Sequence, residues 1–146
     1  MESLKITQEP QFSSEIKEFF TEEWPSANQE VFGFTDQSRW KMEEYILTAK
    51  EENLIIGVAQ FRIIGGVGYL STLLVKKKFR GTGIVGSSLL KHFESTAKER
   101  KCHKLSLKSY KNSRAENFFA KHGYQEEAVL KNDIHGIDWV MMSKKV

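Results

Sequence analysis

The spacing of apolar residues predicts a helix near the start of the chain. Between residues 12 and 24, large apolar side chains recur every three or four positions, with Ile16 and Phe20 among them. This spacing puts them on one face of a helix. Pro25 follows directly, and we expect it to end the helix because proline lacks the N–H that a helix interior uses.

Alternating apolar and polar positions predict strands along the rest of the chain. The predicted strands are 4–7, 45–49, 54–63, 68–75, 104–108, 124–130 and 137–143, and the further predicted helices are 83–100 and 113–121. Because a helix joins 68–75 to 104–108, these two strands should run parallel. The sequence therefore predicts an α+β fold in a single domain, residues 1–146. Its central sheet is mixed, mostly antiparallel and of about six to seven strands, with one β-α-β crossover and flanking helices.

A glycine-rich turn follows the strand 68–75. The run Lys76-Lys77-Lys78-Phe79-Arg80 leads into Gly81, Gly83 and Gly86, and a helix begins there. Glycine lets the backbone turn tightly and approach a ligand, and the first N–H groups of a helix carry the positive end of its dipole. A strand, a glycine turn and a helix N-terminus together predict an anion site, with phosphate as the usual guest.

The same glycines match the G-x-G-x-x-G pattern of dinucleotide-binding proteins. The full pattern needs an acidic residue about 20 residues on, at the end of the next strand, to hold a ribose hydroxyl. Here that strand ends in Lys108-Ser109-Tyr110-Lys111. A lysine there suits a 2′-phosphate, so an NADP-binding enzyme stays open as an alternative. A second alternative also stays open, in which the glycine-rich turn binds no ligand and only lets the helix pack on the sheet.

Charge is distributed unevenly along the 146 residues. The net charge is +3, but residues 1–73 carry 6 basic and 12 acidic side chains, whereas residues 74–146 carry 16 and 7. The basic half favours an anionic ligand, and the acidic half favours a cationic one. Nucleic acid is not expected, because the aromatic and basic interleaving of single-strand binders is missing.

Composition narrows the class and location of the protein. Hydrophobic residues make up 40% of the chain and charged residues 28%, and no apolar run reaches the length of a membrane span. The first ten residues do not read as a secretory signal, and the single Cys102 suits a reducing cytoplasm. The four histidines show no metal-ligand spacing, so no metal is expected.

Two stretches of the chain resemble the GCN5-related N-acetyltransferase family. The first is Phe79-Arg80-Gly81-Thr82-Gly83-Ile84 after the strand, which resembles the family's pyrophosphate loop. The second runs from Asn112 through Ala115 and Phe119 to Gly123-Tyr124, and resembles the helix beside the pantetheine arm. Their order, with a strand between them, matches the family.

The resemblance implies a fold, a cosubstrate and a reaction. It implies an acyltransferase that moves acetyl from acetyl-CoA to a primary amine by direct attack, without metal. The backbone N–H near Leu73 would stabilise the oxyanion. The residues that would contact CoA are Leu73, Leu74, Val75, Lys78, Arg80, Gly81, Thr82, Gly83, Ile84, Val85, Gly86, Asn112 and Phe119.

The sequence departs from the family pattern at two positions. Val85 stands where the family usually has glycine or alanine, so either the loop is longer or the helix begins differently. Phe119 replaces a tyrosine that often protonates the leaving thiolate, and the general acid is therefore unknown. The general base is unknown too, with Glu22, Glu43 and Asp133 as candidates.

An acyl-CoA-binding module without turnover is the alternative that the missing acid favours. For an enzyme, the acceptor would be a small-molecule or peptide amine, and the acidic first half favours a cationic one. The sequence allows either a monomer or a homodimer.

Overall fold

The computed structural model describes residues 4–146 and divides into two compact units, one ending at Arg39 and one comprising Trp40–Val146. The first is here called the N-terminal unit and the second the sheet domain. None of the helices in the described part of the chain is long and apolar enough to cross a membrane.

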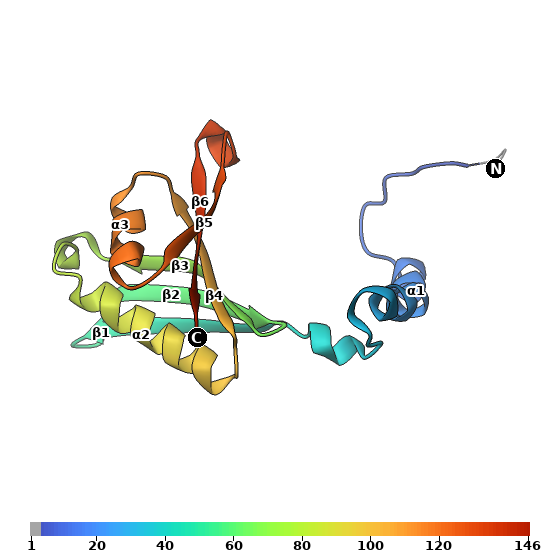
Figure 1. The fold of residues 1–146 in the computed structure, drawn as a ribbon, viewed down its shortest axis with the longest axis horizontal. Helices are drawn as coiled ribbons and strands as arrows, with labels where there is room; N and C mark the ends of the chain where they lie inside the picture. The colour runs from blue at the N-terminus through green and yellow to red at the C-terminus, as the bar shows by residue number, and fades with distance from the viewer. Residues whose placement is uncertain (1–3) are drawn as a thin grey trace. The chain divides into compact units, whose positions relative to one another are not determined.

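The N-terminal unit is built around helix α1, Ser14–Phe32, which precedes a short 3-10 turn, η1, Gln37–Trp40 (Figure 1). Ser13 caps α1 because its Oγ accepts a hydrogen bond from the N–H of Ile16 at 3.2 Å. Gly33, with φ of 74°, ends the helix in the left-handed conformation.

Two predictions for this unit were wrong. Pro25 lies inside α1 rather than at its end. The proline removes only one N–H donor, and the residues after it, including Ala27, Gln29 and Glu30, favour helix until Gly33. The predicted strand 4–7 has no regular structure. These residues pair with no strand, and the edge strand β1 pairs only with β2.

The sheet domain contains a six-stranded sheet with the order β1-β2-β3-β4-β6-β5. Its elements are β1 Glu43–Glu51, β2 Leu54–Ile64, β3 Val67–Val75, η2 Lys77–Phe79, α2 Ile84–Glu99, β4 Lys104–Tyr110, α3 Arg114–Lys121, β5 Gln125–Leu130, η3 Ile134–Gly136 and β6 Trp139–Lys145. Only β3 and β4 are parallel neighbours, and α2 connects them (Figure 1). The predicted α+β class and the single crossover are confirmed.

The core lies on one face of the sheet, under α2 and α3. Phe93 and Ala97 of α2 are fully buried, and they approach Gly68 of β3 and Leu105 of β4. A side chain at Gly68 would lie 3.2 Å from Leu105, so the glycine lets α2 pack closely on the sheet. Within the sheet domain, both α-helices pack on this face, and Ile46 and Leu74 are exposed on the other.

Candidate functional site

The two parallel strands β3 and β4 are paired over only part of their length. Four residue pairs join them, from Val67 opposite Lys104 to Leu70 opposite Leu107. Beyond that point residues 71–75 of β3 and 108–110 of β4 continue without pairing to each other, while each still pairs on its other side. We call the interval between these two segments the interstrand slot. Along the slot, the backbone N–H and C=O groups on the facing edges of β3 and β4 make no hydrogen bonds to each other.

A bulge in β3 stands at the start of the slot. The register with β2 shifts between Gln60 and Phe61, which leaves Ser71 as the extra residue, and the Ser71 hydroxyl donates to the Gln60 carbonyl at 3.0 Å. Bulges increase local twist and re-aim the groups that follow. Leu73 comes two residues later, packed against the core, and Leu74 is 59% exposed on the opposite face. The predicted oxyanion residue thus lies along the slot, just after the bulge.

The glycine turn closes the other end of β3. Gly81 and Gly83 have φ of 95° and 74°, a region that L side chains rarely adopt. A Cβ at Gly81 would meet nothing within 4 Å, so this stretch of backbone is open to a ligand. Gly83 is the N-cap of α2, and the hydroxyl of Thr82 accepts from the N–H of Ile84 at 3.3 Å.

The structure explains the departure at Val85. Helix α2 begins directly after Gly83, so Val85 lies in its first turn with its side chain toward the sheet, where it fills the space over Gly57. Gly86 is buried, and a Cβ there would lie 3.3 Å from the ring of Phe118. Gly86 therefore lets α2 and α3 approach. The side chain of Val85 and the missing side chain of Gly86 thus serve packing, and what these two residues can offer a ligand is their backbone N–H groups in the first turn of α2.

Positive charge gathers beside this helix N-terminus. The Nε of Arg80 donates to the carbonyl of Val75 at 2.6 Å, which folds its guanidinium back toward the end of β3. The ammonium of Lys78 lies 5.1 Å from the ring centre of Phe79. The N–H groups, the helix dipole and these cations together form a site suited to a pyrophosphate.

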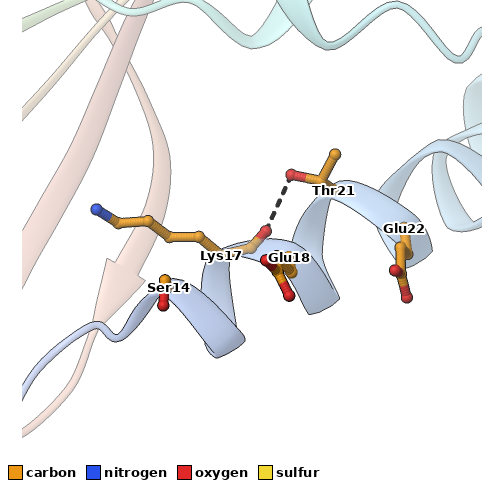
Figure 2. A pocket seen from close by; sticks show the side chains of 5 residues that line it. All are labelled: Ser14, Lys17, Glu18, Thr21 and Glu22. Carbon is orange, nitrogen blue, oxygen red and sulfur yellow. Dashed lines mark hydrogen bonds between the residues drawn. The ribbon is translucent and has the colours of Figure 1, made fainter.

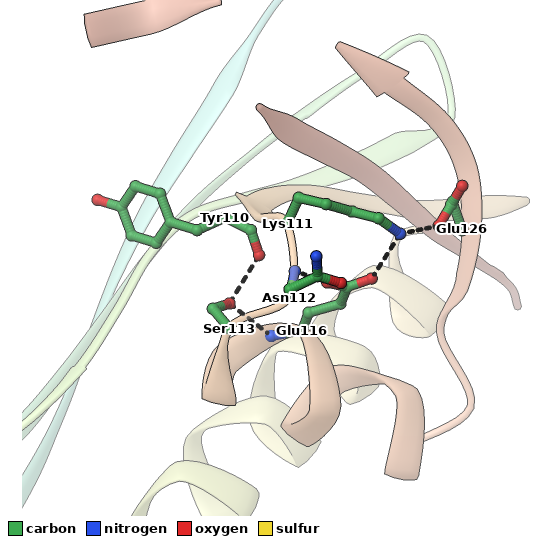
Figure 3. A network of polar contacts seen from close by, with 6 residues as sticks. All are labelled: Tyr110, Lys111, Asn112, Ser113, Glu116 and Glu126. Atoms are coloured by element: carbon green, nitrogen blue, oxygen red, sulfur yellow. Dashed lines mark hydrogen bonds and ion pairs between the residues drawn. The ribbon is translucent and has the colours of Figure 1, made fainter. Parts of the chain in front are cut away.

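A polar network fixes the start of α3 beside the end of β4 (Figure 3). The Ser113 hydroxyl donates to the carbonyl of Tyr110 at 2.7 Å and accepts from the N–H of Glu116 at 3.1 Å. The Glu116 carboxylate in turn accepts from the N–H of Asn112, which has φ of 61°. Asn112 is thus held in a left-handed conformation with its side chain exposed.

Lys111 ties this network to strand β5. Its ammonium lies 2.7 Å from Glu126 and 3.3 Å from Glu116, and Figure 3 shows it between the two carboxylates. The hydrogen bond to Glu126, and then that to Glu116, raises the pKa of Lys111. Sequence reasoning missed Glu116 and Glu126, and it considered Lys111 only as part of a strand end that suits a 2′-phosphate. The Ser113-x-x-Glu116 spacing was the available signal, because it is typical of a helix capping box.

Phe119 and Tyr124 both belong to the core. Phe119 is 7% exposed, and its ring centre lies 5.2 Å from that of Phe118 and 5.8 Å from that of Tyr124. The Tyr124 hydroxyl donates to Glu94 at 3.2 Å. Burial, and then the charge of Glu94, raises the pKa of Tyr124, which keeps its proton bound. Phe119 has no ionisable group, and the hydroxyl of Tyr124 makes a structural hydrogen bond to Glu94. Neither residue is therefore a general acid in this structure.

The three candidate bases lie in different surroundings. Glu43 of β1 accepts from the Tyr45 hydroxyl at 2.6 Å and forms a close ion pair with Arg100 at the C-terminal end of α2. The hydrogen bond from Tyr45, and then that from Arg100, lowers the pKa of Glu43. Because Glu43 pairs with Ile63 and lies at the opposite end of the sheet from Val75, its position does not favour a role at the slot.

Asp133 lies 2.5 Å from the ammonium of Lys108, the first residue of β4 beyond the paired region. One carboxylate oxygen of Asp133 is buried without a hydrogen-bond partner of good geometry. Glu22 lies on α1, where it lines a shallow hollow with Ser14, Lys17, Glu18 and Thr21 (Figure 2). That hollow is formed by one helix surface, and its one drawn hydrogen bond runs from Thr21 Oγ1 to the Lys17 carbonyl at 2.9 Å.

Comparison with protein families identifies the family of this chain. The model described as the Acetyltransferase (GNAT) family matches residues 10–124. The chain belongs to this family of acetyltransferases. Acetyl transfer is therefore its general kind of reaction. No protein matched in a search of curated proteins.

Solved structures with the same fold include acetyltransferases from several bacteria. An acetyltransferase from Bacillus cereus ATCC 14579 is 26% identical and has a TM-score of 0.73, with 96% of this chain and 98% of that chain covered. A GNAT family acetyltransferase from Elizabethkingia anophelis with acetyl-CoA bound is 21% identical, has a TM-score of 0.65 and covers 70% of this chain and 76% of its own. A ribosomal-protein-alanine N-acetyltransferase from Brucella melitensis is 22% identical, with a TM-score of 0.62 and coverage of 83% and 74%. The last two are similar in fold alone.

Proposed function

We propose that this GNAT acetyltransferase uses acetyl-CoA and transfers the acetyl group to a primary amine by direct attack. The observation that carries the proposal is the continuity between the interstrand slot and the glycine turn. A long, thin arm with a pyrophosphate at its end suits that combination, because the slot presents unpaired backbone groups and the turn presents helix N–H groups and cations.

This arrangement supports an assignment of the CoA-binding residues. The backbone N–H groups of residues 81–86, with Arg80, would hold the pyrophosphate, and Lys78 would meet the ribose phosphate. Pantetheine would extend along residues 73–75, with Asn112 and Phe119 on the α3 side. NADP is disfavoured, because the sheet lacks the repeated β-α units of a dinucleotide fold.

The chemistry needs an oxyanion donor, a base and a leaving group. We assign the oxyanion donor to the backbone N–H near Leu73; losing such a donor typically costs about 3 kcal/mol of transition-state stabilisation. The amine attacks the thioester carbon, the C–S bond breaks and CoA leaves as the thiolate. Since Phe119 has no proton, water protonates the thiolate. Asp133 and Glu22 are the candidate bases that remain.

A cationic acceptor is the second part of the proposal. Residues 1–39 carry 8 acidic and 3 basic side chains, and this acidic unit would attract an amine that is protonated in solution. The amine must lose its proton before attack, which is the task of the base.

The single cysteine supports direct transfer. Cys102 is buried, and burial raises its pKa, so it is a core residue rather than a nucleophile. A lone cysteine is also typical of proteins in a reducing compartment, which supports a cytoplasmic location.

Turnover with an amine panel tests the proposal. The full chain is incubated with acetyl-CoA and, separately, with polyamines, a lysine peptide, a neutral amine and an acidic amine, while thiol release and product mass are followed. We expect acetylated product from the cationic amines first. Equal rates with the acidic amine would overturn the cationic preference. Tight CoA binding with no product from any amine would favour the acyl-CoA-binding module.

A further inference from the structure

A serine and a histidine meet where α2 and α3 of the sheet domain approach each other. The Oγ of Ser87, in the first turn of α2, lies 3.0 Å from the Nε2 of His122, which is the C-cap of α3. The other ring nitrogen of His122, Nδ1, lies 2.8 Å from the carbonyl of Phe118, one turn back in α3. The imidazole therefore bridges the end of one helix to the start of the other.

The Phe118 carbonyl fixes the roles of the two ring nitrogens. A carbonyl oxygen only accepts hydrogen bonds, so Nδ1 of His122 carries a proton whether the ring is neutral or charged. In the neutral ring, Nε2 accepts from the Ser87 hydroxyl, and the proton of that hydroxyl points at the histidine. In the imidazolium, Nε2 donates to the Ser87 oxygen, and the hydroxyl proton of Ser87 becomes available to another acceptor.

The Ser87 hydroxyl lies beside the glycine turn. A Cβ at Gly83, the N-cap of α2, would lie 4.0 Å from the Ser87 oxygen. The N–H of Ser87 also donates to the Gly83 carbonyl at 2.8 Å, so the two residues stack one helical turn apart. An anion held by the N–H groups of this turn would therefore lie near the hydroxyl. That hydroxyl can donate to the anion only when His122 is charged.

The charges on the surrounding elements make an anion decisive for the state of His122. The basic side chains on these elements are Lys91 of α2, Lys121 of α3, Lys144 of β6, and Lys78 and Arg80 before the glycine turn. Among the ion pairs of residues 4–146, only Lys144 of this group has a carboxylate partner, Glu94, which also accepts from Tyr124. The unpaired cations disfavour another charge, whereas the dipole at the C-terminal end of α3 and a bound anion favour it.

We propose that Ser87 and His122 bind the pyrophosphate of CoA as a unit: Ser87 donates its hydroxyl to a phosphate oxygen, and His122 takes up a proton when the ligand binds. The inference rests on the proposed use of acetyl-CoA. One proton passes from solvent to Nε2, and no covalent bond between heavy atoms changes. Since lysine and arginine ordinarily stay charged near neutral pH and imidazole does not, the affinity should fall as the pH rises.

Calorimetry with 3′-dephospho-CoA measures this proton directly. The probe keeps the pyrophosphate but lacks the 3′-phosphate, whose own second proton dissociates near pH 6 in phosphate monoesters. We expect the full wild-type chain to take up a proton on binding, seen as different heats in two buffers of unlike ionisation enthalpy. The affinity should fall at least about fivefold between about pH 6 and pH 8, and by no more than about tenfold per pH unit, the limit for one proton.

Two variants and a matched control assign the proton. Ser87→Ala and His122→Gln should each bind the probe without proton uptake and with an affinity that no longer depends on pH. The control is Ser88→Ala, because the neighbouring Ser88 is exposed and its hydroxyl donates to the Ile84 carbonyl at 2.9 Å instead. This control should keep the wild-type pH dependence. Thermal midpoints without ligand show whether each variant is folded.

Failure of this inference differs from failure of the proposed function. Binding of the probe at every pH without proton uptake in the wild type would overturn the role of Ser87 and His122 and leave CoA as the cosubstrate. The same pH dependence in folded Ser87→Ala as in the wild type would overturn it too. If neither CoA nor the probe bound at any pH, the proposed use of acetyl-CoA would fail, and this inference with it.

Discussion

The two ends of helix α2 meet the sheet in opposite ways. At its C-terminal end, Arg100 pairs with Glu43 and Tyr45, and the neighbouring His103 N–H donates to Gly66 at 2.8 Å. At its N-terminal end the strands β3 and β4 are unpaired. Among residues 4–146, no carboxylate forms an ion pair with Lys76, Lys77, Lys78 or Arg80.

The two ends of α2 therefore differ in role: one contributes to stability, and the other is available for ligand binding. Polar groups that find partners inside the protein stabilise it, and they have little left to offer a ligand. Groups that stay without partners beside a helix N-terminus are available to an anion. We call the two regions the closed end and the open end, and the comparison predicts that substitutions at each should affect different quantities.

The largest effect is expected for Gly83→Glu at the open end. The substitution puts bulk and negative charge at the N-cap of α2, where the pyrophosphate is proposed to lie. We expect CoA affinity, measured by calorimetry, to fall at least about 100-fold, roughly 2.7 kcal/mol. A matched control is Gly65→Glu in the turn between β2 and β3, where φ is 57° and a Cβ meets nothing within 4 Å. Wild-type affinity in the Gly83 variant would break the comparison.

A smaller effect is expected for Lys111→Met. Without its ammonium, Glu116 and Glu126 repel each other and the N–H of Asn112 is held less firmly, so CoA should bind several-fold more weakly. The control is Lys104→Met, because Lys104 also pairs β4 with β5, through Glu127, but away from Asn112. Equal loss of affinity in both variants would mean that general stability, not the position of Asn112, is responsible.

Phe119→Tyr sharpens the account of the leaving group. CoA affinity should stay near that of the wild type, since the ring keeps its shape, and kcat should rise if the hydroxyl reaches the thiolate. An unpaired buried hydroxyl costs about 1–3 kcal/mol, so the free energy of unfolding should be measured with kcat. A large loss of CoA affinity would show that Phe119 packs differently from the family's tyrosine.

The smallest effect is expected at the closed end, for Glu43→Gln. Because the pKa of Glu43 is lowered in the folded protein, its contribution to stability is present above the ordinary value of 4.5 and is lost as pH falls through the lowered pKa. Urea midpoints should therefore differ between wild type and variant at pH 7 and converge in acid, while CoA affinity stays the same. A pH-independent difference would contradict this account.

The sequence predicts the sheet domain well because its signals are local. Period-two strands and the glycine turn act within a few positions, and the helix between β3 and β4 was enough to predict the one parallel pair. Val85 was harder to place, because its side chain is explained by the space over Gly57, which is far from it in sequence.

The failures come from long-range partners. Residues 4–7 have strand-like residues but no strand beside them, and Pro25 is tolerated because the residues after it continue the helix. Nothing in the sequence around Glu43 indicates that Arg100, 57 positions later, would pair with it. The Lys111 network joins β4, α3 and β5, so only the folded chain brings its members together.

Thermal unfolding with added ligands tests the central claim, that the open end binds CoA. The full chain is heated with CoA, acetyl-CoA or NADP, and the Gly83→Glu variant is heated in parallel. A ligand at about 100 times its dissociation constant should add roughly 2.7 kcal/mol of stability. We predict stabilisation of the wild type by CoA and acetyl-CoA alone, and none in the variant. Stabilisation by NADP without CoA, or an equal shift in the variant, would contradict the claim.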